Sequence, residues 1–245
     1  VSDRSSPDLK LSDFHKFLRF ILYKNTDGII CQTHLSMLNI SRITKHRNIK
    51  VIGNPIRKIS KREKYQRENI ILNVGRFISS KQQINLIEIF ASIEHEGWRL
   101  VFIGEGQYLD EARKKVFELG LEDKVTFVGE SNNVDEYLNR SKIFAFTSIL
   151  EGFPNALGEA LETPLSCISF NCIAGPSDLI INNYNGFLIN NNDFVEYKRK
   201  LQILMVNDKL REYFERNSTT KMKEFEINLI SNKYYSFLTN EDTAN

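Results

Sequence analysis

The chain has 245 residues, of which 41% are hydrophobic and 26% are charged, and its formal net charge is +2. This length and composition allow one large domain or two smaller ones with a full hydrophobic core. The near-neutral balance excludes the strongly basic composition of a typical nucleic-acid binder. The longest apolar runs fall far below the roughly 20 residues of a membrane-spanning helix, and the chain carries no signal-peptide pattern.

The cysteines are odd in number and lie at Cys31, Cys167 and Cys172, without CxxC or Cys/His spacing. This pattern argues against a disulfide framework and against a zinc site. It is typical of a reducing compartment, so we expect a cytoplasmic protein.

The first 55 residues contain a short set of elements after a polar, unpatterned start at 1–13. The predicted elements are a helix over 14–23, a strand over 28–31, a helix over 35–45 and a strand over 49–52. The set stops at Gly53-Asn54-Pro55, where the proline forces the preceding residue out of helical geometry. Because so few elements bury too little for independent folding, we expect residues 1–55 to be the end of a Rossmann-like domain whose beginning is absent. A charged linker follows at 56–68.

Beyond the linker, short apolar runs alternate with amphipathic segments, which predicts an α/β fold with a parallel sheet. The predicted strands are 70–74, 99–103, 124–128, 143–147, 166–170 and 186–189. The periodicity predicts helices over 84–93 and 108–119. We expect this Rossmann-like domain to span 69–215, with C-terminal helices over 216–245.

The first candidate site follows the strand at 70–74, where Gly75-Arg76 precede a Ser-Ser-Lys run that ends at Lys81. Ligands of open α/β sheets bind at the carboxyl ends of strands, where helix N-termini favour anions. Arg76 and Lys81 are therefore placed to meet a phosphate-bearing ligand. The alternative is a pair of surface cations near a helix start.

Gly104-Glu105-Gly106 follow the next strand and lack the third glycine of a GxGxxG motif, which disfavours a dehydrogenase-type dinucleotide site. A strand-to-helix turn that needs glycine explains them equally well.

The most informative stretch is EGFPNALGE, from Glu151 to Glu159, which follows a predicted strand. Pro154 is favoured in the first turn of a helix, so the amides of Asn155, Ala156 and Leu157 would face the crevice and suit a diphosphate. Both glutamates could point to that cleft and accept hydrogen bonds from hydroxyls. A solvated helix position for Glu159 and a helix cap for Glu151 are the alternatives.

At this point the sequence resembles the large family of retaining glycosyltransferases of GT-B fold often called family four. The resemblance covers residues from about 14 to the end. Its motifs are GRFISSK (75–81), FIGEG (102–106), VTFVG (125–129), the glutamate-seven-glutamate motif (151–159) and NGFLI (185–189). The family usually has a glycine after the lysine of the first motif, and here Gln82 stands in that position.

The resemblance implies a role for each motif. Arg76 and Lys81 would bind the donor diphosphate, with Glu151 at the donor hexose and Glu159 at the ribose hydroxyls. The amides of Asn155, Ala156 and Leu157 would complete the diphosphate cradle, and Gly129 with Glu130 would border the base. Gly75 and Gly104 are also expected among the donor-binding residues. Such enzymes need no metal, because basic side chains and helix amides neutralise the leaving diphosphate.

We therefore expect a retaining glycosyltransferase, or its donor-binding half, that moves a hexose or N-acetylhexosamine from a UDP-sugar to a polysaccharide or lipid-linked glycan acceptor. The resemblance points to the branch that builds bacterial surface polysaccharides such as lipopolysaccharide and O-antigen. A non-catalytic UDP-sugar-binding fragment and a sugar-nucleotide epimerase on the same fold remain alternatives.

A basic stretch runs from residue 42 to residue 67, with Glu63 as its one acid. Its cations are Arg42, Lys45, Arg47, Lys50, Arg57, Lys58, Lys61, Arg62, Lys64 and Arg67. It is read either as a solvated linker or as a peripheral contact with an anionic membrane on the cytoplasmic face of the inner membrane. Nucleic-acid binding is disfavoured, because Tyr65 is the one aromatic residue interleaved.

Overall fold

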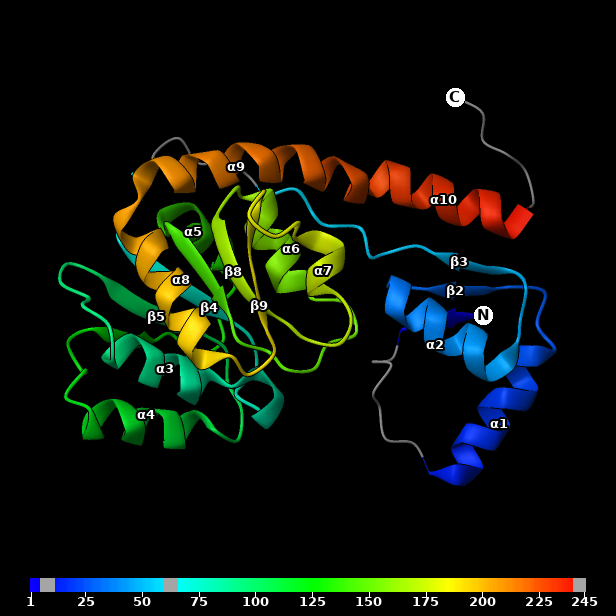
Figure 1. Ribbon diagram of the computed structural model, residues 1–245, viewed down its shortest axis with the longest axis horizontal. Coiled ribbons are helices and arrows are strands. Elements are labelled where there is room, and N and C mark those ends of the chain that lie inside the picture. Colours follow the sequence, from blue (N-terminus) through cyan, green and yellow to red (C-terminus); the bar gives the residue numbers. More distant parts are fainter. Residues whose placement is uncertain (5–11, 60–65, 240–245) are drawn as a thin grey trace.

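A computed structural model describes residues 1–4, 12–59 and 66–239. Figure 1 shows a large parallel sheet wrapped by helices, a small sheet beside it, and two C-terminal helices that run along both. The strands of the large sheet are β4 (Ile70–Val74), β5 (Arg99–Ile103), β6 (Val125–Phe127), β7 (Ile143–Phe146), β8 (Ser166–Asn171) and β9 (Gly186–Asn190). Their order is β6-β5-β4-β7-β8-β9, and every pair is parallel.

Helices cover both faces of the large sheet, so alternate strand residues enter two separate cores. On β4, Ile71 belongs to the core shared with α3 (Gln83–Ala91), α4 (Leu109–Glu118) and α8 (Phe194–Val206). Leu72 belongs to the core shared with α5 (Val134–Arg140), α6 (Asn155–Glu162) and α7 (Pro176–Leu179). The continuous apolar runs of the sequence follow from this double burial.

The small sheet has the order β1-β2-β3 and is also parallel. Its elements are β1 (Ser2–Asp3), α1 (Asp13–Lys24), β2 (Ile29–Cys31), α2 (His34–Thr44) and β3 (Ile49–Val51). The prediction of an unpatterned start was wrong at β1. That strand is two polar residues long, and its Asp3 is buried against Arg19 and the Tyr23 hydroxyl.

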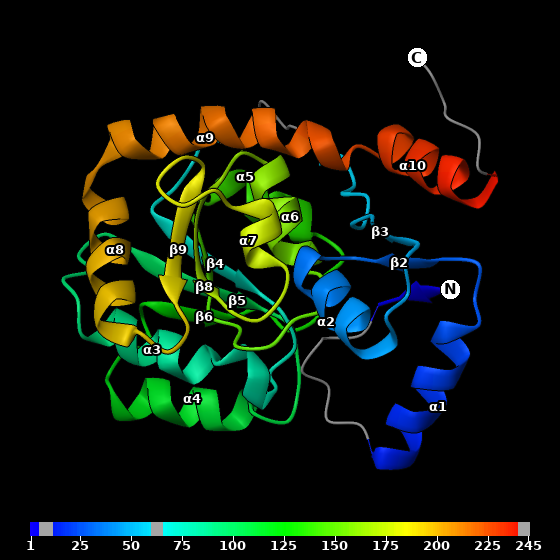
Figure 2. The same ribbon diagram turned by 45° about the vertical axis from the view of Figure 1, so that its right-hand side comes forward.

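The C-terminal helices bridge the two sheets (Figures 1 and 2). Helix α9 (Asp208–Met222) contacts β8 and α6 of the large sheet, and a short turn η2 (Lys223–Phe225) follows it. Helix α10 (Ile227–Thr239) packs on the small sheet, where Ile230 contacts Ile30 and Ile52. The expected boundary after residue 215 falls inside α9.

The described residues of the expected linker pack against the large sheet. Ile56 and Ile59 are buried in its core, and the Ile56 amide donates to the Phe225 carbonyl at 2.9 Å. Arg67 donates to the carbonyls of Ser141 and Thr163, both at 2.7 Å. The basic stretch is therefore not one free surface over its described residues, and its docking on a membrane stays a prediction. Lys61, Arg62, Lys64 and the nearby Glu63 and Tyr65 lie outside the described residues.

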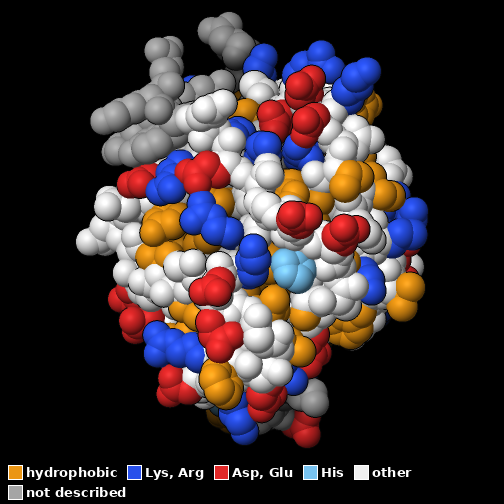
Figure 3. All heavy atoms as spheres, turned by 90° about the vertical axis from the view of Figure 1, so that its left-hand side faces the viewer, with side chains coloured by type: hydrophobic (Ala, Val, Ile, Leu, Met, Phe, Trp, Pro, Cys, Tyr) orange, Lys and Arg blue, Asp and Glu red, His pale blue; other side chains and the backbone are white. Residues whose placement is uncertain are grey.

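The end of the molecule farthest from the small sheet carries interspersed basic and acidic side chains (Figure 3). This mixture agrees with the near-neutral composition of the chain. That face offers no uniformly basic surface for a polyanion.

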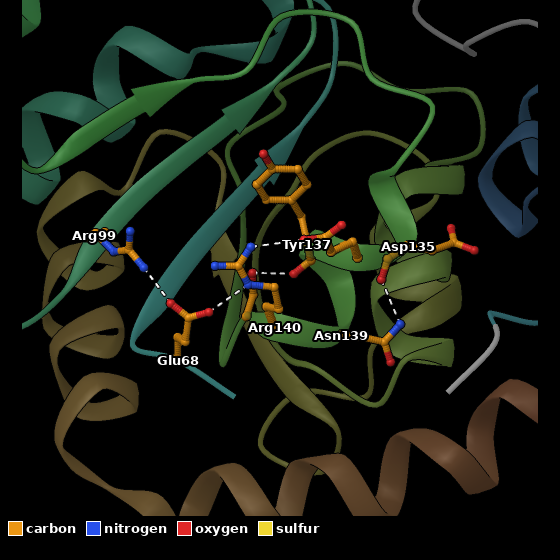
Figure 4. Close-up of polar contacts among 8 residues, drawn as sticks. Glu68, Arg99, Asp135, Tyr137, Asn139 and Arg140 are labelled. Atoms are coloured by element: carbon orange, nitrogen blue, oxygen red, sulfur yellow. Dashed lines mark hydrogen bonds and ion pairs between the residues drawn. The ribbon is translucent and has the colours of Figure 1, made fainter. Parts of the chain in front are cut away.

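Glu68 fixes the point where the linker enters the large sheet (Figure 4). Its carboxylate accepts hydrogen bonds from Arg140 of α5 at 2.7 Å and from Arg99 of β5 at 2.6 Å. These partners, Arg140 first, hold the pKa of Glu68 below its ordinary value. The carboxylate therefore ties the start of β4 to a neighbouring strand and to a covering helix.

We expect Glu68→Gln to lower the free energy of unfolding by about 0.5–1 kcal/mol at neutral pH, a small value because the side chain is one-third exposed. Because the folded-state pKa is lowered, the contribution is full above the ordinary pKa of 4.5 and is lost as the pH falls through the lowered value. Denaturant unfolding from neutral to acidic pH measures the difference, with exposed Glu122→Gln as the control. A deficit that stays constant into acid would contradict the assignment.

Candidate functional site

The strand order places a topological switch point between β4 and β7. The chain adds β5 and β6 on one side of β4 and then returns to place β7 on the other side. Ligands of open α/β sheets bind in the crevice outside such a switch point. The two loops that leave it, 75–81 and 147–154, therefore define the candidate site, and they carry Gly75, Arg76, Lys81 and Glu151.

Hydrogen bonds join these two loops directly. The Thr147 hydroxyl donates to the Lys81 carbonyl at 2.9 Å, and the Ile149 amide donates to the Ser80 carbonyl at 2.8 Å. Below them, the buried side chain of Asn73 on β4 donates to the Ala145 carbonyl of β7 at 2.8 Å. These hydrogen bonds hold the two loops and the strands β4 and β7 together in addition to the backbone hydrogen bonds of the sheet.

The predicted glycines bring three strand ends together. The Gly104 amide donates to the Gly129 carbonyl, and the Gly75 amide donates to the Ile103 carbonyl, both at 2.9 Å. Gly104 has a φ of +135°, and a Cβ there would lie 2.2 Å from the Gly75 carbonyl oxygen. Glycine at 104 is therefore required by close backbone contact, which agrees with a strand-to-helix turn that needs glycine. Glu130 follows Gly129 and is exposed.

Lys81 and Glu151 form an ion pair between these two loops, 75–81 and 147–154, with Nζ donating to Oε1 at 2.5 Å. Their side chains are only 20% and 10% exposed, and the Lys81 ammonium lies 5.5 Å from the centre of the Phe146 ring. Arg76, which follows Gly75 in the sequence, is exposed. The loop at 75–81 thus carries one exposed guanidinium and one largely buried ammonium paired with Glu151, and the exposed guanidinium favours an anionic ligand.

The start of α6 supplies two backbone donors. Among the described residues, no backbone carbonyl accepts from the amides of Ala156 and Leu157. The third amide predicted to face the crevice, that of Asn155, is not free, because it donates to the Phe153 carbonyl at 3.0 Å. That part of the prediction was wrong, and the turn through Pro154 is the reason. The Asn155 side chain instead accepts from Asn54 at 3.0 Å.

The two glutamates of the motif face different cations. Glu159 Oε1 accepts from Arg57 Nε at 2.7 Å, whereas Glu151 pairs with Lys81. Sequence reasoning expected both carboxylates to be available to hydroxyls in one cleft, and it assigned Arg57 to the basic stretch. A hollow of about 420 Å³ opens beside Glu159, and Asn54, Arg57 and Asn155 line it together with Arg4, Pro55, Ile56 and Tyr234.

Two further residues were missed in the sequence. Phe153 packs against Phe225 with ring centres 5.9 Å apart, and a Cβ at Gly53 would lie 2.9 Å from the Phe153 ring. Asn54 joins Asn155 as described above. The Gly53-Asn54-Pro55 turn was a local signal for Asn54, but its contacts with the loop before α6 are distant in sequence and left no signal.

The departure at Gln82 falls at a backbone position that favours glycine. Gln82 has a φ of +55°, the left-handed region that favours glycine. Its side chain accepts a hydrogen bond from Asn85 in the first turn of α3. The glycine usual in the family and the glutamine here therefore serve the same backbone turn.

The cysteines are buried and free of disulfides. Burial, reinforced by the neighbouring Glu151 carboxylate, raises the pKa of the Cys172 thiol to about 12. Burial also raises the pKa of Cys31 to about 11 and that of Cys167 well above its ordinary value. None of the three is therefore suited to act as a thiolate nucleophile.

In residues 1–4, 12–59 and 66–239, no group of three or more His, Cys, Asp or Glu side chains is arranged to hold a metal ion. No helix in the same ranges is both long and apolar enough to cross a bilayer.

Comparison with known proteins identifies relatives of this chain. The family model "Glycosyl transferases group 1" matches residues 55–221, which contain the whole large sheet. An α-1,4-N-acetyl-D-galactosaminyltransferase from Campylobacter jejuni, named for GalNAc-α-(1→4)-GalNAc-α-(1→3)-diNAcBac-PP-undecaprenol, is 26% identical over all of this chain and 68% of its own length.

Solved structures match the fold over nearly the whole chain. Anabaena HepE in complex with UDP has a TM-score of 0.89 at 18% identity, over 98% of this chain and 71% of its own. A Staphylococcus aureus TarM mutant, solved with fondaparinux, α-GlcNAc-glycerol and UDP, has a TM-score of 0.85 at 23% identity over 96% of this chain. The chain spans about half of TarM, 49% of its length.

Proposed function

The chain belongs to the group 1 family of glycosyltransferases, and from this membership we propose that it carries the donor site of a retaining enzyme. The enzyme transfers a hexose or N-acetylhexosamine from a UDP-sugar to a polysaccharide or lipid-linked glycan acceptor. The observation that supports this most is the β4/β7 switch point, whose two loops carry Arg76 and the Lys81–Glu151 pair and lead into the start of α6. Residues 69–215 bind the donor, and residues 1–55 belong to the acceptor side.

Each group in the crevice has a task in this proposal. Arg76, Lys81 and the amides of Ala156 and Leu157 bind the diphosphate, beside the turns at Gly75 and Gly104. Glu151, held by Lys81, accepts hydrogen bonds from the donor sugar. Glu159 accepts from the ribose hydroxyls beside the hollow at Asn155. Gly129 and Glu130 border the base.

The reaction breaks the bond between the anomeric carbon and the diphosphate oxygen and forms one from that carbon to an acceptor hydroxyl oxygen, whose proton passes to the leaving diphosphate. Negative charge grows on the leaving diphosphate in the transition state. Fixed cations and amide dipoles that are already oriented stabilise that charge without reorganisation. The same groups make a divalent cation unnecessary in this proposal.

The preference for UDP rests on the relatives. Both HepE and the TarM mutant were solved with UDP. The Campylobacter relative is named for an α-1,4 transfer within an undecaprenol-linked glycan, which supports an α-linked product and a lipid-linked acceptor here. The proposal places the donated sugar in one of two classes, the hexoses or the N-acetylhexosamines.

Calorimetric titration of this chain with UDP, GDP, UDP-galactose and UDP-N-acetylglucosamine, with and without EDTA, tests the proposal. We expect saturable binding of the UDP compounds that EDTA leaves unchanged, and weaker binding of GDP. Loss of UDP binding in EDTA would overturn the metal-independent contact with the diphosphate, and no binding of any UDP compound would overturn the donor-site assignment.

Arg76→Ala and Glu159→Ala are each expected to weaken UDP binding by more than about tenfold, or about 1.4 kcal/mol. Arg76 contributes charge to the diphosphate, and Glu159 contributes hydrogen bonds to the ribose. Arg113→Ala on the exposed side of α4 is the matched control, because Arg113 has only a long contact of 3.8 Å to Asp110. Wild-type affinity in both site variants would remove these residues from the site.

A further inference from the structure

Arg57 joins two helices that border the nucleotide side of the site. Its Nε donates to Glu159 Oε1 of α6 at 2.7 Å, and its Nη2 donates to Asp135 Oδ1 of α5 at 2.6 Å. Figure 4 shows Asp135 at the start of α5, with its carboxylate directed away from the Glu68 cluster. The two carboxylates, Asp135 first, raise the pKa of Arg57 further above its ordinary value, so the guanidinium is always charged.

The backbone around Arg57 is held in place. Ile56 is buried, and its amide donates to the Phe225 carbonyl. A Cβ at Gly158 would lie 2.4 Å from Ile56 Cδ1, so the absence of a side chain there lets this segment lie directly on α6. Ile59 anchors the other side in the same core. Arg57 is therefore presented to Glu159 by a fixed segment.

Only one oxygen of Glu159 is occupied by Arg57. A carboxylate held at one oxygen by a fixed donor loses most of its rotational freedom, and its second oxygen keeps its acceptor capacity. Resting on the proposed donor site, we propose that Arg57 is a positioning residue that orients Glu159 so that its free oxygen accepts from the ribose hydroxyls. Arg57 itself does not touch the nucleotide in this arrangement.

Asp135 explains why Arg57 leaves that second oxygen free. An arginine facing a single carboxylate prefers a bidentate arrangement, with two parallel hydrogen bonds to both oxygens. Here Nη2 donates to Asp135 through one of its two N–H groups, which holds the guanidinium toward α5, and Arg57 contacts Glu159 through Nε alone. Removing the Asp135 carboxylate would release Nη2 to claim the oxygen that the ribose needs.

The test compares UDP with 2′,3′-dideoxy-UDP, which lacks the ribose hydroxyls, by calorimetric titration of the whole chain. We expect the wild type to prefer UDP by more than about tenfold. In Arg57→Ala and in Asp135→Ala this preference falls to about threefold or less, because UDP binds less tightly while dideoxy-UDP binds as before. In Arg57→Ala combined with Glu159→Ala no further preference is lost. Lys58→Ala is the control, because its ammonium is mostly exposed and lies 3.5 Å from Glu226.

The outcomes separate this inference from the proposed function. A wild-type chain that binds no UDP overturns the proposed donor site and this inference with it. A wild type that discriminates between the two ligands, together with an Arg57→Ala variant that discriminates equally well, overturns this inference alone. Equal losses of UDP and dideoxy-UDP in Arg57→Ala overturn it too, because they indicate a loss of folding or of a phosphate contact.

Discussion

Replacing Gly104 with alanine should lower the free energy of unfolding by about 3 kcal/mol or more and should also weaken UDP binding. The added Cβ would lie 2.2 Å from the Gly75 carbonyl oxygen and 2.8 Å from its carbon. These are backbone atoms, which no rotamer change moves aside. Relief requires displacing the loop that begins at Gly75 and carries Arg76 and Lys81, so the damage reaches the site. Denaturant unfolding and UDP titration of the variant measure the two effects.

Gly120→Ala is the matched control for this change. Gly120 also has a positive φ, +65°, but no heavy atom lies within 4 Å of a Cβ built there. It ends α4, with its amide donating to the Phe117 carbonyl and the Leu121 amide donating to the Val116 carbonyl. The expected loss is therefore about 1 kcal/mol, from left-handed backbone strain alone. Equal losses of unfolding free energy in the two variants would show that the contact with Gly75 does not destabilise Gly104→Ala.

The large sheet is largely predictable from the sequence because both of its faces are buried. The runs at 70–74 and 99–103 coincide with β4 and β5 as observed. Strand ends are less predictable, because backbone hydrogen bonds can extend a strand past the last apolar side chain. β8 and β9 each extend to an asparagine, and Asn171 pairs with Asn190. β1 was not predicted, because two polar residues, Ser2 and Asp3, are too few to show the alternation of apolar and polar side chains that marks a strand.

The positions of the site residues were predictable, but their partners were not. Parallel strands end at one edge of a sheet, so Gly75, Gly104 and Glu151 had to come near each other. Which cation meets which carboxylate depends on contacts distant in sequence. Glu159 lies 102 residues from Arg57. The charge count placed Arg57 in a basic stretch. In the structure, the neighbouring Ile56 and Ile59 are buried in the core and hold the Arg57 segment against α6.

The second large effect is expected for Lys81→Ala, which should weaken UDP binding by about a hundredfold or more. It should also lower the free energy of unfolding by about 2–3 kcal/mol, because it leaves the carboxylate of Glu151 without its cation. That side chain is only 10% exposed, so water compensates poorly for the lost ammonium. UDP titration and denaturant unfolding again separate the two quantities.

A paired substitution distinguishes a binding role from a structural one. In Lys81→Met combined with Glu151→Gln, neither partner is charged, and two side chains of similar volume fill the same space. Replacing both members of a buried ion pair is often neutral for stability, whereas removing one is costly. We therefore expect the double variant to regain most of the stability that Lys81→Ala loses, but none of its UDP affinity. Recovery of both would mean that Lys81 serves only to neutralise Glu151, and that Arg76 and the α6 amides bind the diphosphate without it.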